Sequence, residues 1–167
     1  MDTGRPIVKH LERSRFDVAL EAVAFAGLVF LIGISTHYYS ALPATIPTHF
    51  NFKGEPDGWG GKGTLLLLPA IGVILYLGLT VLSRFPHLFN YPGTITESNA
   101  SRQYAIARQL ISAVKVSLVV TFSYITWAMI QTARGIQNGL SPSFALLESP
   151  VLFAIIGFYI FKARKAR

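Results

Sequence analysis

The sequence predicts an all-α membrane protein with four transmembrane helices and an ordered extracytoplasmic loop between the first two helices. Apolar residues make up 51% of the chain and charged residues only 14%. The apolar residues gather into four long runs, and about 20 helical residues are enough to cross a hydrocarbon core about 30 Å thick. A dense block of polar, aromatic and turn-forming residues separates the first two runs. We treat residues 1–167 as a single membrane domain.

The four apolar runs are expected to be helical because lipid offers no hydrogen-bond partner to an exposed peptide group. The first run follows a basic N-terminal segment, but it is longer than the apolar region of a secretory signal and is predicted to be a retained span. Pro69 and Pro150 lie near one end of the second and fourth runs, where a missing amide donor costs least. The predicted spans cover about residues 16–39, 64–82, 105–131 and 144–161. Thr94 and Glu97 have the spacing of a capping box, which predicts a helix that begins near Ser98 at the membrane interface and runs into the third span.

Basic residues predict how the spans are oriented. The 15 Lys and Arg exceed the 8 Asp and Glu and give a formal net charge of +7. Most of these bases flank the predicted spans on one side: Arg5, Lys9, Arg13, Arg15, Arg84, Arg102, Arg108, Lys162, Arg164, Lys165 and Arg167. The first and third connections hold only Lys53, Lys62 and Arg134. Because loops rich in Lys and Arg stay in the cytoplasm, both termini and the 85–104 connection are predicted to be cytoplasmic, and the 40–63 loop extracytoplasmic.

Composition also excludes several classes of function. The sequence has no cysteine, so disulfides, thiolate catalysis and cysteine-ligated metal sites are excluded. A nucleic-acid partner is not expected, because the basic residues flank apolar spans instead of lining a folded surface. The partner that all four spans predict is the lipid bilayer.

The 40–63 loop is predicted to form a compact cap over the helix ends. Its prolines restrict backbone angles, its glycines permit turns, and its aromatic side chains supply apolar surface. Polar and aromatic residues alternate from Thr48 to Phe52, which predicts a short strand, and the segment from Gly54 to Gly58 is predicted to be a turn. Lys62 precedes the second span, where it would either snorkel to the headgroups or form a surface ion pair with an acid of the loop.

The same loop holds the candidate binding residues, which combine aromatic rings with an imidazole, an amide, two carboxylates and an amine: His49, Phe50, Asn51, Glu55, Asp57, Trp59 and Lys62. Because imidazole and carboxylate groups are zinc ligands, a zinc site at His49, Glu55 and Asp57 is an alternative. His37 and Glu148 would be its further ligands. Zinc sites usually show two histidines at a defined spacing, and the loop has one. In a second interpretation the polar side chains hydrogen-bond the loop's own backbone and fix its turns, and Trp59 anchors the loop at the membrane interface instead of contacting a ligand.

Ionisable residues also lie inside the predicted spans. Glu21 belongs to the first span and Lys115 to the third, each toward the cytoplasmic end. A charge at the centre of a span costs about 2.5–3.5 kcal/mol on insertion scales, so a partner or a wet pocket is expected. We predict either that Glu21 and Lys115 pair between the two helices or that each reaches the membrane surface alone. Glu148, near the outer start of the fourth span, is expected to sit among the headgroups or to face the loop.

Residues 42–62 follow the pattern LPxxIPTHFNxxGxPDxWGxK. This pattern resembles the signature at the N-terminus of SdpI-type bacterial immunity proteins, which is also found in many small bacterial membrane proteins. The block from Asn90 to Tyr104 is similar to the short stand-alone members. The resemblance implies a multi-pass protein of the bacterial inner (plasma) membrane. It also implies a role like that of the relatives that protect a cell from a secreted toxin and relay its presence to a cytoplasmic repressor.

The sequence therefore favours a non-enzymatic membrane protein whose extracytoplasmic loop recognises or senses a ligand, with a peptide or protein as the expected partner. The alternative is a membrane metal-binding protein or metalloenzyme that uses zinc at His49 and the neighbouring acids. A third class, a small carrier, would require a homo-oligomer, because four spans rarely enclose a solvated path. No catalytic residue is assigned.

Overall fold

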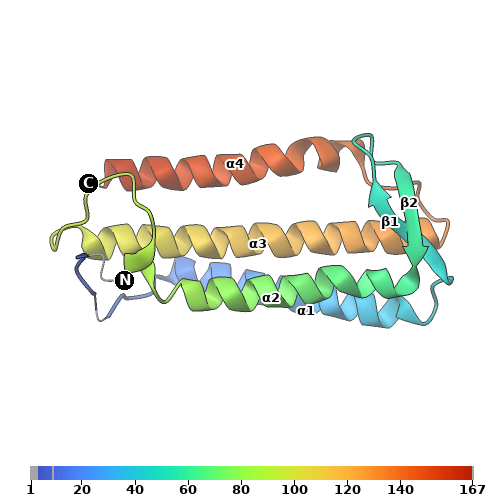
Figure 1. Ribbon diagram of the computed structural model, residues 1–167, viewed down its shortest axis with the longest axis horizontal. Helices are drawn as coiled ribbons and strands as arrows, with labels where there is room; N and C mark the ends of the chain where they lie inside the picture. The colour runs from blue at the N-terminus through green and yellow to red at the C-terminus, as the bar shows by residue number, and fades with distance from the viewer. Residues whose placement is uncertain (1–3, 9, 167) are drawn as a thin grey trace.

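The computed structural model describes residues 4–8 and 10–166, apart from the side chain of residue 145. Lys9 and Arg167, two of the bases that predict the orientation, lie outside these described residues. Within them, four long helices run side by side with a two-stranded sheet across one end, which we call the hairpin end (Figure 1). The start of α1 and the end of α4 both lie at the opposite end. In chain order the elements are α1 (Arg15–Tyr39), β1 (Thr45–Phe50), β2 (Pro56–Gly61), η1 (Lys62–Leu66), α2 (Leu67–Leu82), η2 (Pro86–Leu88), α3 (Ala100–Ala133) and α4 (Pro142–Lys165).

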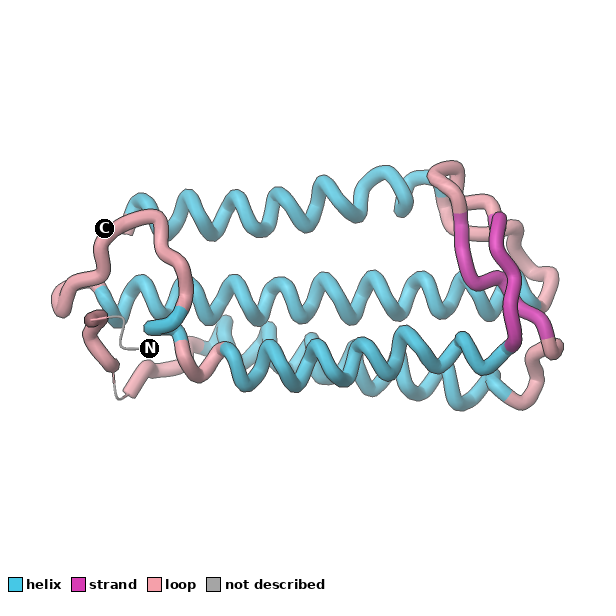
Figure 2. Tube along the Cα trace, viewed as in Figure 1, coloured by secondary structure: helices cyan, strands magenta, loops and turns pink. Residues whose placement is uncertain are grey.

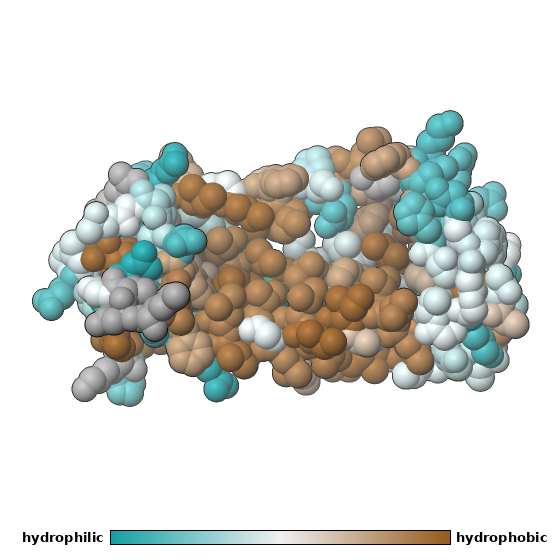
Figure 3. Space-filling view, in the orientation of Figure 1, coloured by the Kyte–Doolittle hydropathy of each residue, from teal (hydrophilic) through white to brown (hydrophobic). Residues whose placement is uncertain are grey.

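The middle of the bundle is covered by apolar side chains. Figure 3 shows a broad hydrophobic band between two more polar ends. Large apolar residues are exposed on each long helix, among them Phe25, Leu77, Val120 and Phe153. Water would disfavour so large an apolar surface, whereas lipid tails solvate it. Among the described residues, four helices are long and apolar enough to cross a membrane. The predicted all-α membrane fold is thus confirmed, and the chain is a multi-pass membrane protein in a lipid bilayer.

The helix ends follow local sequence signals. Ser14 caps α1 because its Oγ accepts from the Asp17 N–H over 3.1 Å while Asp17 Oδ2 accepts from the Ser14 N–H over 2.6 Å, the reciprocal arrangement of a capping box. The second apolar run begins as the 3-10 helix η1, and α3 begins at Ala100, earlier than the third predicted span. Pro150 lies inside α4 instead of near its end, so the carbonyl of Leu146 lacks its usual helical donor.

α3 is the central helix of the bundle and packs against α1, α2 and α4. Its contact with α1 is close because Gly27 has no side chain: a Cβ there would lie 2.7 Å from Val119 Cγ2. The face of α1 that meets the bundle presents Ala24, Leu28 and Leu31, which are buried and recur at helical spacing. α4 packs mainly on α3, so most of its surface is left open to lipid.

An apolar cluster fixes the hairpin to the helices. β1 and β2 pair antiparallel, with Pro47 opposite Trp59. Ile46 of β1 is fully buried and lies in one cluster with Leu42, Leu65, Met129 and Ile130. Burial of one aliphatic side chain of this size contributes ~1.5–3 kcal/mol. The ordered loop expected between the first two spans is therefore a packed β-hairpin, shown in magenta across the helix ends in Figure 2.

The segment before α1 is tied to the connection between α2 and α3. The Arg5 guanidinium donates to the carbonyl oxygens of His87, over 3.1 Å, and of Phe89. It also lies 5.5 Å from the centre of the Tyr91 ring. The Tyr91 hydroxyl donates to the carbonyl of Pro86 over 2.8 Å, and burial raises the pKa of this phenol. These contacts order the end of the bundle opposite to the hairpin.

Candidate functional site

The turn of the hairpin is built around Asn51. Its Oδ1 accepts from the N–H groups of Lys53 and Glu55 over 2.9 and 3.0 Å, and its Nδ2 donates to Glu55 Oε2 over 3.1 Å. Asn commonly stabilises turns through such bonds to the backbone. Gly54 adopts the positive φ of 83° in this turn, which glycine reaches without steric cost. The turn lies earlier in the chain than the sequence predicted, because β2 already begins at Pro56.

His49 and Asp57 face each other across the two strands. His49 Nδ1 lies 2.5 Å from Asp57 Oδ1, and the two side chains are 72% and 43% exposed. An ionised carboxylate only accepts hydrogen bonds, so Nδ1 carries the hydrogen. An exposed pair of this kind contributes only ~0–1 kcal/mol to stability. Its main effect is to orient the imidazole, and Nε2 is the ring nitrogen left for a ligand.

The residues of the alternative zinc site do not converge on one point. His49 pairs with Asp57, whereas Glu55 is held at the turn by Asn51. His37 makes an edge-to-face contact with the ring of Tyr38 at the end of α1. Within residues 4–8 and 10–166, no group of three or more His, Cys, Asp or Glu side chains could hold a metal ion. The geometry offers two ligands at this site, fewer than the three protein ligands of a catalytic zinc centre.

Two aromatic side chains of the hairpin are exposed. Phe52, in the turn, is 99% exposed and Trp59, in β2, is 56% exposed. Phe50, by contrast, packs against the apolar cluster beneath the hairpin. Lys62 Nζ lies 5.1 Å from the centre of the Tyr39 ring. The ammonium therefore makes a cation–π contact in place of the surface ion pair that was one of its two expected roles.

The turn is locked to the loop that precedes α4. The carbonyl of Gly54 accepts from the Leu140 N–H over 2.7 Å. Neither segment has room for a side chain here: a Cβ on Gly54 would meet the Leu140 oxygen, and a Cβ on Gly139 would meet the Gly54 oxygen. Ser141, which follows Leu140, donates its N–H to Tyr124 Oη of α3 over 3.0 Å. A displacement of the hairpin turn would therefore also displace the loop that leads into α4.

The structure brings Glu21 and Lys115 together inside the bundle. Lys115 Nζ lies 2.6 Å from Glu21 Oε2, and the lysine side chain is 1% exposed while that of the glutamate is 26% exposed. Ser112 Oγ donates to the other carboxylate oxygen over 2.6 Å, and Lys115 Nζ donates to Thr80 Oγ1 over 3.1 Å. The ammonium also lies 4.8 Å from the centre of the Tyr76 ring. The site supplies the hydrogen bonds that buried charges require and joins α1, α2 and α3.

A second charged site lies about one helical turn closer to the start of α1. Arg108 NH2 lies 3.4 Å from Asp17 Oδ2, and NH1 donates to the carbonyl of Leu11 over 3.0 Å. This pair was not predicted from the sequence, where Arg108 is expected only as a base that flanks a span. The spacing in the sequence contains a signal for this second pair. Asp17 is four positions before Glu21, so the two acids share one face of α1. Arg108 is seven positions before Lys115, so the two bases share one face of α3.

The fold and these sites define a multi-pass helical membrane protein with a structured β-hairpin docked on one end of a charge-linked bundle. Residues 26–73, which run from α1 through the hairpin into α2, match the family model described as Domain of unknown function (DUF1648). A relative from Archaeoglobus fulgidus, described as an uncharacterized protein, is 29% identical over an alignment of 176 residues that covers 97% of this chain and 83% of the relative. No solved structure matches. These likenesses assign no activity, and the resemblance to immunity proteins stays a prediction.

Proposed function

We propose that this chain is a non-enzymatic recognition protein whose hairpin binds an extended peptide arriving from the extracytoplasmic side. One observation carries the proposal: the hairpin is packed on the helices and hydrogen-bonded to the loop before α4, yet its Phe52 and Trp59 rings are exposed. Aromatic side chains are enriched in binding interfaces, where they act as anchors. Rings that served only to pack the cap would be buried, as Ile46 is.

Polar groups beside the exposed indole of Trp59 would orient a bound peptide and select among peptides. Asp57 and Trp59 are two positions apart on β2 and both exposed, so they share one face of the strand. His49 joins this face from β1 through its contact with Asp57. A carboxylate–imidazole pair next to an indole suits a peptide that carries one apolar and one basic side chain, because the basic group can form a charge-assisted hydrogen bond.

β2 also supports binding through its backbone. In the described residues the sheet has two strands, and β1 packs on α3 and η1, which leaves β2 as the outer edge. The N–H and C=O groups of an edge strand can pair with an added peptide strand. Pro56 cannot donate, so the usable edge is residues 57–61.

Peptide selection on the membrane-embedded protein tests the proposal. A random peptide library displayed on phage is selected against wild-type protein in nanodiscs, with counter-selection on empty nanodiscs. We expect enriched peptides with a shared pattern that bind the Phe52→Ser/Trp59→Ser double variant at least about tenfold more weakly, because losing an aromatic anchor typically costs ~2 kcal/mol or more. Phe85→Ser removes an exposed ring outside the hairpin and should bind as wild type does. Equal binding to all three proteins, or no enrichment, would refute hairpin recognition.

Metal analysis separates this proposal from the zinc alternative. Protein purified after exposure to zinc should retain less than one zinc per chain, with no difference between wild type and His49→Ala. One zinc per chain that is lost in His49→Ala would replace peptide recognition with metal binding.

Toxin immunity is a special case of the proposal and has its own assay. Sensitive cells that express the chain are challenged with a membrane-active peptide toxin, and expression is matched between wild type and the hairpin double variant. Better survival with wild type alone supports immunity. Unchanged survival removes immunity, while the peptide selection still decides whether the hairpin binds peptides.

A further inference from the structure

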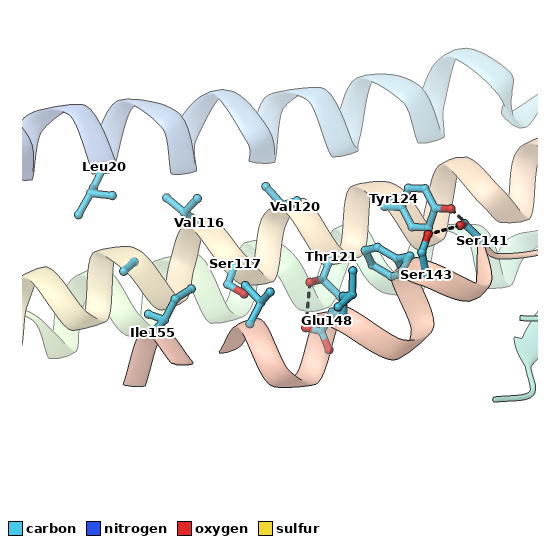
Figure 4. A pocket seen from close by; sticks show the side chains of 14 residues that line it. Leu20, Val116, Ser117, Val120, Thr121, Tyr124, Ser141, Ser143, Glu148 and Ile155 are labelled. Atoms are coloured by element: carbon cyan, nitrogen blue, oxygen red, sulfur yellow. Dashed lines mark hydrogen bonds between the residues drawn. The ribbon is translucent and has the colours of Figure 1, made fainter. Parts of the chain in front are cut away.

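A groove runs along the membrane-spanning surface between α4 and the α1–α3 pair. Its volume is about 740 Å³. The walls are mostly apolar, and Figure 4 shows Leu20 on α1, Val116 and Val120 on α3, and Ile155 on α4 around it. The groove exists because α4 packs mainly on α3 and not on α1. It is separate from the exposed rings of the hairpin.

Glu148 gives this groove its chemical character. Among the described side chains that line the groove, it is the charged one. Its Oε1 accepts from Thr121 Oγ1 of α3 over 3.1 Å, as the dashed line in Figure 4 marks. Its Oε2 accepts from Ser149 Oγ over 3.5 Å, which is long for a hydrogen bond and therefore weak. Glu148 therefore faces the groove and not the hairpin loop, and one of its carboxylate oxygens is weakly compensated.

Glu148 also lies deep between the two ends of the bundle. Its partner Thr121 is twelve positions from Ala133, the last residue of α3, and twelve from Gln109, which accepts from Lys162 Nζ near the opposite end. At about 1.5 Å per residue, each separation is about 18 Å. Glu148 is thus deeper than the headgroup position considered from the sequence. Ionisable side chains at such depth usually mark a binding site or an ion path.

We propose that the groove binds a cationic amphiphile, a small molecule with one protonated amine and one hydrocarbon chain. The ammonium would lie at Glu148 and form a charge-assisted hydrogen bond with Oε2. The Ser117 hydroxyl, which lines the same groove, can accept a further N–H. The hydrocarbon chain would lie along the aliphatic wall between Val116 and Ile155.

Charge selects this class of ligand over other amphiphiles of the same length. A carboxylate or phosphate head would place a second negative charge beside Glu148. A neutral head would leave the carboxylate unpaired in a region of low dielectric, which is unfavourable. An ammonium compensates the existing charge and uses the oxygen that the protein itself leaves weakly bonded.

Native mass spectrometry of the full chain in a neutral detergent tests the proposal. Dodecylamine, dodecanol and dodecanoate are the probes, because they share a chain length and differ in the charge of the head. Wild type is compared with Glu148→Gln, which keeps an acceptor for Thr121. The matched control is Glu97→Gln, which removes an exposed carboxylate from the connection before α3. Circular dichroism establishes that all three proteins keep the same helix content.

We expect one dodecylammonium ion per wild-type chain, bound about tenfold or more tightly than dodecanol or dodecanoate, because a hydrogen bond to a charged group is worth ~1.5–3 kcal/mol, or about 10- to 150-fold. Glu148→Gln should abolish this preference, and Glu97→Gln should keep it. Leu147→Trp, which fills part of the groove, should weaken the amine and the alcohol together. Equal binding of the three probes, or an amine preference that survives Glu148→Gln, would overturn the proposal. The groove would then be a gap between helices that membrane lipid fills without selection for charge.

Discussion

Glu21 and Lys115 should be energetically coupled, and this can be measured with three variants: Glu21→Gln, Lys115→Met and the double variant. The two charges lie 2.6 Å apart, with the lysine side chain 1% exposed and the glutamate 26% exposed. Removing one member of a buried pair leaves the other charge without its counterion, which typically costs about 3–5 kcal/mol. The unequal exposure means that the two single variants should not cost the same.

The surroundings of each charge set the expected order. Glu21→Gln leaves a buried ammonium with the Thr80 hydroxyl and the Tyr76 ring, so we expect a loss of about 3 kcal/mol in the free energy of unfolding. Lys115→Met leaves a carboxylate that still accepts from Ser112 and that water can reach, so we expect about 2 kcal/mol. The double variant leaves neither charge, and the coupling energy should be about 2–3 kcal/mol.

Unfolding in mixed micelles measures these differences. Sodium dodecyl sulfate is titrated into the four proteins of the cycle at constant ionic strength, and helix loss is followed by circular dichroism. We expect Glu21→Gln to unfold at the lowest fraction of the denaturing detergent and the double variant to unfold later than that single variant. Losses that simply add would show that each side chain reaches the membrane surface independently.

Two further predictions concern the two ends of the bundle. Gly54→Ala should lower the free energy of unfolding by about 1–3 kcal/mol, because its φ of 83° is strained for alanine and the new Cβ meets the Leu140 oxygen. Limited proteolysis should then cut residues 135–141 faster than in wild type. The control variant Gly61→Ala, with open space at its Cβ, should be cut as wild type is. The lock is refuted if both variants are cut alike. Burial raises the Tyr91 pKa in the folded state, so the unfolded chain loses this proton first, at about pH 10, and stability should fall as pH rises above that point. Melting temperatures from about pH 8 to 11 should fall less steeply in Tyr91→Phe, and parallel curves would contradict this.

The spans could be predicted from sequence because lipid imposes a length and a composition on them. The early start of α3 could also be predicted, because the capping-box spacing before Ser98 predicts a helix that runs into the third span, and α3 begins at Ala100. The cap itself was wrong, since the N-cap residue is Asn99 and not Thr94. The tertiary contacts of this stretch could not be predicted: the buried Gln103 Nε2 donates to the Ala163 carbonyl of α4 over 2.9 Å. The hairpin turn was misplaced for a local reason. Gly54, Pro56 and Gly58 are strong turn signals, but the Asn51 side chain closes the turn at Glu55, so Gly54 lies in the turn while Pro56 and Gly58 lie in β2.

In the candidate site, residue type could be used to predict which side chains need partners, but not which side chains lie close together in space. Residue type alone singled out Glu21 and Lys115, because charges in a span need partners, and the structure places them 2.6 Å apart. Residue type could not say that Lys62 lies over the Tyr39 ring, since Tyr39 belongs to a different element. It also could not give the depth of Glu148, which depends on how α4 packs on α3.

Thiol labelling shows most directly which side of the membrane the hairpin faces. The sequence has no cysteine, so Lys53→Cys places a single thiol in the exposed turn. Spheroplasts and inverted vesicles are treated with a membrane-impermeant maleimide, and Glu97→Cys, in the connection between α2 and α3, is the control for the other side. We predict that the position 53 thiol is labelled in spheroplasts and the position 97 thiol only in inverted vesicles. Labelling of position 53 only in inverted vesicles would put the hairpin in the cytoplasm and contradict recognition of an external peptide.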